Sequence, residues 1–201
     1  MAVPQAREAV VRVPWQINFK KDLTGFKELW SLNHPMKIIL SFLIIFLSIS
    51  PAIAQKSLDK LLEQYNTRSI PYISVEELRM LQMNDSVAIL DARETEEFNV
   101  SHIASAKNVG FNDFSSEEKQ LQKLKKDTPI IIYCSVGIRS EKIGEKLKKV
   151  GFTNVKNLYG GIFEWKNKDY PVIDSTGTET ENVHTFSKIW RKYLKEGNPI
   201  Y

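Results

Sequence analysis

Two short apolar runs, at residues 87–90 and 130–133, constrain the fold of this chain more than any other feature. Each run has four consecutive apolar residues, and turn-forming residues precede both, 84–86 before the first and Pro129 before the second. Strands that are buried on both faces have this pattern, because helices cover a parallel sheet on either side. We therefore expect both runs to be central strands of a parallel sheet.

Helical signals lie before the first run and after the second. Ser74 and Glu77 have the spacing of a capping box, which opens a helix that we expect to end near Met83. After the second run, a helix is expected to end before Gly151, a residue that tolerates the left-handed conformation of a helix end. Three of its apolar residues share one face: Ile143, Leu147 and Val150.

A further helix is expected between the two runs. Ser115 and Glu118 have the spacing of a second capping box, and the helix would carry Leu121 and Leu124. Shorter strands are expected at 72–73, 108–110 and 155–158. This alternation predicts an α/β fold, with a central parallel sheet of about five strands and helices on both faces.

The segments on either side of this body, residues 68–172, have their own patterns. Residues 55–67 predict a short helix, capped by Ser57, that packs on the edge of the domain. Its apolar face would hold Leu58, Leu61, Leu62 and Tyr65. In the C-terminal part, 173–201, a polar linker is expected at 173–181 and an amphipathic helix at 183–194. That helix could dock on the domain, bind a protein partner or lie on a membrane surface.

The N-terminal part has the pattern of a signal peptide at residues 36–54. A lysine precedes an apolar run at 38–47, and Pro51 and a small-x-small sequence ending at Ala54 follow it. We expect cleavage near Ala54 and a periplasmic or secreted protein. The alternative is a membrane anchor, if 38–54 is retained, although this segment is shorter than the roughly 20 apolar residues that span a bilayer. Residues 1–35 would be an upstream extension outside the fold, with translation starting at Met36.

Charge and composition exclude several classes of function. The net charge is +4, but residues 1–54 hold six Lys and Arg against three Asp and Glu, which leaves 22 against 21 for the rest. No basic cluster interleaved with aromatic residues occurs there, so we expect no nucleic-acid partner. One cysteine cannot form an intramolecular disulfide. The three histidines and the cysteine are scattered singly, and no glycine-rich nucleotide loop occurs, so neither a metal nor a cofactor is expected.

That cysteine, Cys134, follows the second apolar run directly, at the edge of the sheet where ligands bind in open parallel folds. Gly137 allows a tight turn in which successive N–H groups can point at one atom. Arg139 and the N-terminus of a helix beginning near Ser140 both add positive charge, which favours a thiolate. The sequence therefore predicts a reactive thiol, and the alternative is a small buried apolar residue at the end of a strand.

The spacing between Cys134 and Arg139 separates two classes of enzyme. Four residues lie between them: Ser135, Val136, Gly137 and Ile138. Cysteine phosphatases need a loop one residue longer, so that it closes around a phosphoryl group. The smaller ring of N–H groups fits a single sulfur atom carried on Cys134, which makes a phosphatase or an arsenate reductase the weaker hypothesis.

Over about residues 68–172 the sequence resembles the rhodanese family of sulfurtransferases. Three ordered segments carry the resemblance: Asp91-Ala92-Arg93 with Glu97-Phe98 and His102-Ile103-Ala104-Ser105-Ala106, the loop 134–140, and Asn157 to Trp165. Ser135, Val136 and Ile138 are uncharged, whereas some thiosulfate-using relatives have basic residues in this loop, so the preferred donor stays open.

The resemblance implies a double-displacement reaction without a cofactor. The Cys134 thiolate would take the outer sulfur of a donor such as thiosulfate and become a persulfide, held by the N–H groups of Ser135, Val136, Gly137, Ile138, Arg139 and Ser140. The persulfide would pass its sulfur to cyanide or a thiol. Arg139 would bind the anionic donor or fix the loop by bonding a carboxylate.

Two further sites have less direct roles under this resemblance. Asp91 and Arg93 would support the loop from behind, or form an ordinary ion pair at a strand end. His102 would be largely structural. The competing hypothesis is a rhodanese-like binding or sulfur-carrier module with little turnover, which recruits a protein partner through residues 183–194.

Overall fold

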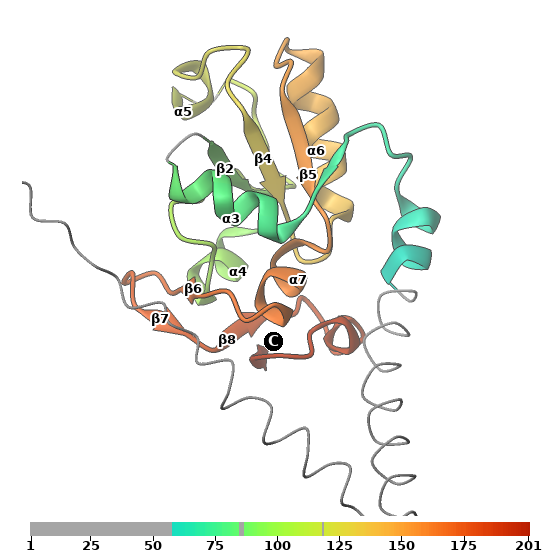
Figure 1. Cartoon of the computed structure of the whole chain (residues 1–201), viewed down its shortest axis with the longest axis vertical. Helices are drawn as coiled ribbons and strands as arrows, with labels where there is room; N and C mark the ends of the chain where they lie inside the picture. The colour runs from blue at the N-terminus through green and yellow to red at the C-terminus, as the bar shows by residue number, and fades with distance from the viewer. Residues whose placement is uncertain (1–57, 85–86, 118) are drawn as a thin grey trace, which may run out of the picture. The chain divides into compact units, whose positions relative to one another are not determined.

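The structure is a computed structural model that describes residues 58–84, 87–117 and 119–201. Its centre is a five-stranded sheet in the order β1-β5-β4-β2-β3, in which every neighbouring pair is parallel (Figure 1). The strands are β1 (Tyr72–Ile73), β2 (Ala88–Asp91), β3 (Lys107–Asn108), β4 (Ile130–Tyr133) and β5 (Val155–Leu158). Both apolar runs are therefore adjacent central strands, as predicted. The predicted signal peptide at 36–54 and the cap Ser57 lie outside the described residues.

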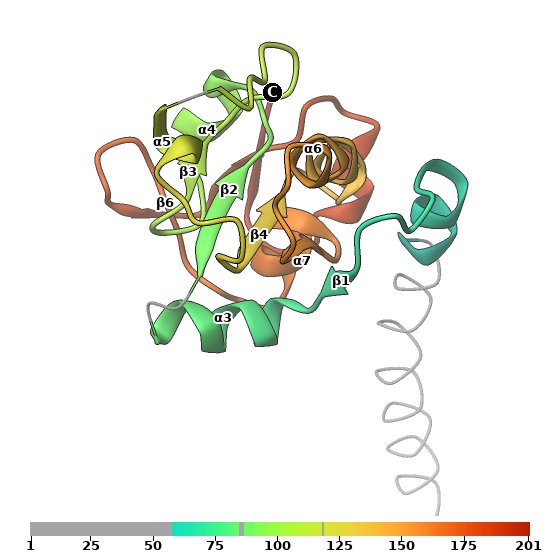
Figure 2. The ribbon, with the colours of Figure 1, turned by 90° about the horizontal axis from the view of Figure 1, so that it is seen from above.

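Helices cover both faces of the sheet, which confirms the predicted α/β architecture. The helices are α3 (Val75–Met83), α4 (Thr95–Val100), α5 (Lys119–Gln122), α6 (Ile138–Lys149) and α7 (Gly161–Asn167). Seen from above, α3 lies on one side of the sheet, and α5 and α6 lie on the other (Figure 2). Because side chains alternate along a strand, β4 places Ile131 and Tyr133 in one core cluster with α3 and α7, and Ile130 and Ile132 in a second with α6.

The ends of α3 and α6 follow the predicted signals, but two apolar residues do not lie where they were expected. The capping box is present, since the Ser74 hydroxyl accepts from the Glu77 N–H at 3.1 Å and the Glu77 carboxylate accepts from the Ser74 N–H at 3.0 Å. Gly151 has the expected positive φ, 96°. However, Val150 is 40% exposed, so it does not share the buried face of α6. Helix α5 ends at Gln122, so Leu124 lies beyond it. Glu118 of the second predicted capping box lies outside the described residues.

The N-terminal helix packs more deeply than expected. Residues 58–65 are helical, and Leu58 and Leu62 belong to the same core cluster as Leu158 and Ile162. Tyr65, which the pattern placed on the same face, is 55% exposed. In the described part of the chain, no helix has both the length and the apolar character needed to cross a membrane.

The C-terminal part corrects the sequence prediction. In place of a linker, β6 (Val172–Ile173) and β7 (Glu179–Thr180) form an antiparallel hairpin. In place of a helix over 183–194, β8 (Asn182–His184) pairs in parallel with β9 (Asn198–Ile200), and only a 3-10 turn, η1 (Trp190–Tyr193), is helical.

The backbone at Phe186 is incompatible with the predicted helix. Phe186 has a φ of 61°, a left-handed conformation that interrupts a right-handed helix. Asp174 stabilises the turn between β6 and β7. Its carboxylate accepts hydrogen bonds from the N–H groups of Thr176 and Thr178 at 2.8 and 3.1 Å. In Figure 1 the segment from β8 to β9, in orange and red, lies beyond the arrowhead of β4, at the carboxyl edge of the sheet.

Candidate active site

Cys134 lies directly after β4, where the chain turns from the sheet into α6. Its side chain is almost fully buried, but its sulfur accepts a hydrogen bond from the Gly137 N–H at 3.2 Å and lies 3.6 Å from the Ser140 hydroxyl oxygen. Gly137 caps α6 with a φ of 107°, which only glycine adopts readily. The helix begins at Ile138 rather than near Ser140, so the helix N-terminus is closer to the sulfur than the sequence suggested.

The surroundings of the thiol favour its ionised form. Burial by itself raises the pKa of Cys134, because an apolar environment disfavours charge. The positive charge of Arg139, the backbone and hydroxyl of Ser140, and the Gly137 N–H act in the opposite direction and outweigh it. The pKa of Cys134 therefore lies below the ordinary value for a cysteine, and the thiolate is the nucleophilic form.

Arg139 fixes the loop through a carboxylate. Its guanidinium donates to both oxygens of Glu97, at 2.6 and 2.8 Å, and to the Ser135 hydroxyl at 3.1 Å. Glu97 comes from α4. Burial raises its pKa, but the hydrogen bonds and charge of Arg139, with the charge of Arg93 and the Glu94 N–H, together lower it by more. Of the two roles left open for Arg139, the structure shows the bond to a carboxylate, and Glu97 supplies it.

Asp91 and Arg93 form an ion pair with each other at the end of β2. Both side chains are fully buried, and the Arg93 Nη2 atom lies 2.7 Å from Asp91 Oδ2 and 2.7 Å from the carbonyl oxygen of Ser101. In residues 58–84, 87–117 and 119–201, neither side chain has a hydrogen bond to the 134–140 loop. They join β2 to the segment after α4, which is the ordinary ion pair of the two alternatives.

The contacts of His102 are with Phe98 of α4 and Ile173 of β6. Its ring stacks on Phe98 with centroids 3.8 Å apart, and its Nδ1 lies 3.1 Å from the Phe98 carbonyl oxygen. Its backbone pairs with Ile173. These contacts agree with a structural role.

Besides Glu97, further residues that support the loop were not predicted as site residues. Asn66 and Asn157 each donate to the Gly137 carbonyl oxygen at 2.8 Å, and the Asn157 Oδ1 accepts from the Ser140 hydroxyl at 2.7 Å. At the start of α7, the N–H of Ile162 donates to the Cys134 carbonyl oxygen at 2.9 Å. Gly161 packs against the same carbonyl so closely that a Cβ there would lie 2.2 Å from its oxygen. Asn157 carried a usable signal, since an asparagine inside a strand pattern needs buried partners.

A cavity of about 200 Å³ opens beside the sulfur. Besides Cys134 it is lined by Ser135, Val136, Ile138, Arg139, Phe186 and Trp190. The last two belong to the C-terminal segment and were not predicted to reach the site.

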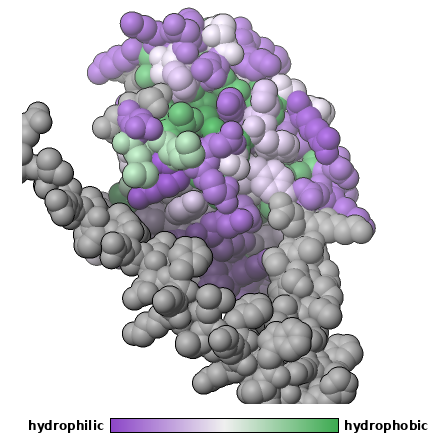
Figure 3. Space-filling model, viewed as in Figure 1, coloured by the Kyte–Doolittle hydropathy of each residue, from purple (hydrophilic) through white to green (hydrophobic). Residues whose placement is uncertain are grey.

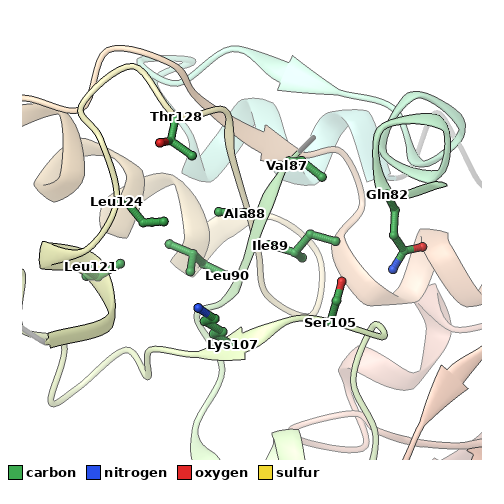
Figure 4. Close-up of a pocket in the computed structure, with 10 residues that line it drawn as sticks. All are labelled: Gln82, Val87, Ala88, Ile89, Leu90, Ser105, Lys107, Leu121, Leu124 and Thr128. Carbon is green, nitrogen blue, oxygen red and sulfur yellow. The ribbon is translucent and has the colours of Figure 1, made fainter. Parts of the chain in front are cut away.

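A larger cavity, of about 440 Å³, lies at the amino end of β2 and is drawn in Figure 4. Its lining includes Val87, Leu121 and Leu124, and Lys107 is its one charged residue. In Figure 3, hydrophobic residues also reach the surface in the upper half of the domain. This cavity contains no cysteine, and its polar lining residues are Gln82, Ser105, Lys107 and Thr128. The described residues also contain no cluster of three or more His, Cys, Asp or Glu that could hold a metal ion.

Comparison with known proteins gives a family match. Residues 74–168 match the family model of the Rhodanese-like domain. The tRNA uridine(34) hydroxylase of Onion yellows phytoplasma is 34% identical over 122 residues, which are 59% of this chain and 39% of that protein. YrkF of Bacillus subtilis, provisionally named a sulfur carrier protein, is 35% identical over 104 residues, 51% of this chain and 55% of that protein. The chain thus spans about two fifths to just over half of the length of these relatives.

One solved structure agrees on the fold, and a second gives a weaker alignment. The thiosulfate sulfurtransferase of Pseudomonas aeruginosa aligns with a TM-score of 0.50 at 22% identity, over 70% of this chain and 26% of that one. The human single-domain sulfurtransferase TSTD1 aligns with a TM-score of 0.45 at 24% identity, over 50% of this chain and 98% of that one. At 22% identity the likeness to the Pseudomonas aeruginosa protein concerns the fold alone.

Proposed function

Because residues 74–168 form a rhodanese-like domain of the sulfurtransferase and sulfur-carrier family, we propose that the chain moves a sulfane sulfur through a persulfide on Cys134. The observation that carries the proposal is the Gly137 N–H bonded to the sulfur, on a thiol whose pKa is lowered. An N–H group that stabilises a thiolate can also stabilise the persulfide anion that replaces it.

The reaction has two steps. The Cys134 thiolate attacks the outer sulfur of thiosulfate, a new S–S bond forms, and the S–S bond of thiosulfate breaks so that sulfite leaves with the electron pair. In the second step the carbon of cyanide, or the sulfur of a thiolate, attacks the outer sulfur of the persulfide. Thiocyanate or a new persulfide leaves, and the Cys134 thiolate returns. No proton transfer is needed at the sulfur when it starts ionised.

The other loop residues act by position. Arg139 is held by Glu97 and Ser135, so it places a positive charge beside the sulfur and keeps the loop closed. The N–H groups at the start of α7 hold the carbonyls of Cys134 and Ser135, at 2.9 and 3.1 Å, and so leave the loop's own N–H groups for the sulfur.

The experiment is to incubate the purified protein with thiosulfate and to follow its mass. We expect a gain of one sulfur atom, which cyanide removes with release of thiocyanate. Cys134→Ser should abolish the gain and leave the thermal unfolding temperature nearly unchanged, because the two side chains have similar volume. A Cys134→Ser variant that still transfers sulfur would refute the assignment.

A second candidate is a sulfur-carrier module with little turnover of its own. The similarity to YrkF, whose name describes a sulfur carrier protein, supports it. The same mass experiment separates the two: a carrier would gain one sulfur atom and keep it in the presence of cyanide, while the enzyme would turn over.

We further propose that the protein is exported, with cleavage after Ala54. The support is the sequence pattern of 36–54 alone. N-terminal sequencing of the native protein tests it: a first residue at Gln55 is expected, and a retained Met1 or Met36 would contradict export.

A further inference from the structure

Phe186 and Trp190 bring the C-terminal segment to the mouth of the Cys134 cavity. Both residues lie outside the family match, which ends at residue 168, yet both line the cavity beside the sulfur. Figure 1 shows their segment at the carboxyl edge of the sheet, where the Cys134 loop also lies. This chain therefore completes its candidate active site with residues from beyond the matched domain.

The segment is fixed there by specific contacts. Thr185 is fully buried and its N–H donates to the Ile200 carbonyl oxygen at 2.9 Å. The next residue, Phe186, adopts a φ of 61°, and its ring lies 5.2 Å from the guanidinium carbon of Arg139. Such a contact attracts the cation to the face of the ring. The ring of Phe186 is thereby held beside the loop although it remains 59% exposed.

Trp190 is held in place by contacts between its turn and α7. Its turn, η1, is tied to α7, because the Asn167 side chain donates to the Tyr193 carbonyl oxygen at 2.9 Å and accepts from the Lys195 N–H at 2.7 Å. The Trp190 side chain is partly buried and packs against the core cluster that contains Ile131 and Tyr133. Both aromatic walls of the cavity are thus built into the fold of residues 182–200.

The residues that line the Cys134 cavity are mostly apolar. Apart from the sulfur, the lining consists of Val136, Ile138, Phe186 and Trp190, with Ser135 and Arg139 as its polar members. Both polar side chains already bond to Glu97, whose charge offsets that of Arg139. A small dianion that entered would lose water without meeting an unpaired cation in the described lining, which is costly. An organic group would instead contact two aromatic rings.

We propose that Phe186 and Trp190 determine donor specificity, and that they favour a sulfane sulfur carried on an apolar, aromatic group over inorganic thiosulfate. An arenethiosulfonate is the simplest member of this class. The Cys134 thiolate attacks its outer sulfur, the S–S bond to the protein forms, and the arenesulfinate leaves with the electron pair of the broken bond. This inference rests on the proposed function for its chemistry, but its selectivity can be measured separately.

The first experiment compares two donors of equal charge, benzenethiosulfonate and methanethiosulfonate, by kcat/KM for sulfur transfer to cyanide. We expect a preference for the phenyl donor of about tenfold or more, from contact of one ring with the aromatic walls. Phe186→Ala and Trp190→Ala should each lower this ratio about three- to tenfold, and Phe186→Leu should lower it less. The intrinsic reactivities of the donors cancel when variants are compared. Equal ratios in all proteins would overturn the inference.

Ile189→Ala is the matched control. Ile189 lies in the same segment, is 75% exposed and does not line the cavity. Its removal should leave the donor ratio unchanged. A fall in the ratio equal to that of Phe186→Ala would mean that the segment acts only through its fold, and would also overturn the assignment to the two aromatic side chains.

A second experiment works even if no persulfide forms. Cys134 is the only cysteine of the chain, so its labelling by N-phenylmaleimide and N-methylmaleimide reports the same cavity without sulfur transfer. We expect the ratio of the two labelling rates to fall in Phe186→Ala and Trp190→Ala and to stay constant in Ile189→Ala. If labelling shows this pattern but no donor forms a persulfide, the proposed function fails and the aromatic selectivity stands. If the labelling ratio does not change, the selectivity fails, and thermal unfolding of each variant verifies that it is folded.

Discussion

Arg139 and Glu97 are joined by two hydrogen bonds, of 2.6 and 2.8 Å, although they are 42 residues apart in the sequence. Their side chains are 18% and 4% exposed, so the pair is largely removed from water. The pair connects α4 to the first turn of α6, on the two sides of the Cys134 loop. It sets both the closure of the loop and the net charge beside the sulfur.

Glu97→Ala should destabilise the protein by about 3 kcal/mol, because it leaves a mostly buried guanidinium without its counter-ion. Urea unfolding measures this change. Glu97→Gln keeps the shape and part of the hydrogen bonding, so its loss should be smaller. An unfolding free energy that does not change in Glu97→Ala would mean that the ion pair does not hold the loop.

The Arg139–Glu97 pair also predicts how the stability of the protein depends on pH in the acid range. Since the pKa of Glu97 is lowered in the folded protein, its contribution to stability is present above the pKa of an unfolded glutamate and is lost as the pH falls through the lowered folded value. Wild-type protein should therefore lose stability more steeply at acid pH than Glu97→Gln does. Unfolding curves recorded across the acid range measure both slopes, and parallel slopes would contradict the prediction.

Ser140→Ala should raise the pKa of Cys134, because the Ser140 hydroxyl lies 3.6 Å from the sulfur and helps to lower that pKa. The pH dependence of alkylation by iodoacetamide measures the change, and the curve should move to higher pH. Ser101→Ala is the control: this serine is also fully buried, but its hydroxyl has no hydrogen-bond partner in the described structure. A shift of equal size in both variants would exclude a specific role for Ser140.

Asp91→Ala should lower the free energy of unfolding and leave the alkylation of Cys134 unchanged. The Asp91–Arg93 pair is fully buried, and removal of one partner leaves an uncompensated charge at a cost of about 3–5 kcal/mol. Neither side chain bonds to the 134–140 loop within the described residues, so the alkylation curve of Cys134 should stay in place. Asp91→Asn, which retains a hydrogen-bond acceptor, gives a better-folded protein for the same comparison. A shift of the alkylation curve in Asp91→Asn would show that the Asp91–Arg93 pair supports the Cys134 loop.

The body of the fold could be predicted because its signals are local. The strand at 130–133 has a run of apolar residues that no exposed segment would carry, and the capping box at Ser74 depends on residues three apart. The Cys134 loop was found for the same reason, since Gly137 and Arg139 follow the cysteine within five residues. Spacing along the chain was sufficient for these features.

The parts that were missed depend on contacts between distant segments. Nothing near Arg139 in the sequence identifies Glu97 as its partner, and nothing near Phe186 shows that it reaches Cys134. The apolar residues of 183–194 recur at helical spacing, but the positive φ of Phe186 and the pairing of β8 with β9 give the segment another structure. Tertiary pairing there overrides the local pattern, which is the usual limit of periodicity as evidence.

Gly161→Ala should displace the Cys134 loop and remove most of its reactivity. A Cβ at this position would lie 2.2 Å from the Cys134 carbonyl oxygen and 2.8 Å from Ser135, and backbone atoms cannot move aside as a flexible side chain can. Because Gly161 also has a positive φ, part of any effect would come from backbone strain. Gly177→Ala isolates that part, since Gly177 has a φ of +83° and nothing within 4 Å of an added Cβ. We expect Gly177→Ala to cost about 1 kcal/mol in urea unfolding with an unchanged alkylation rate, and Gly161→Ala to cost several times more and to slow alkylation of Cys134. Equal costs and equal alkylation rates in the two variants would show that the close approach of α7 does not shape the loop.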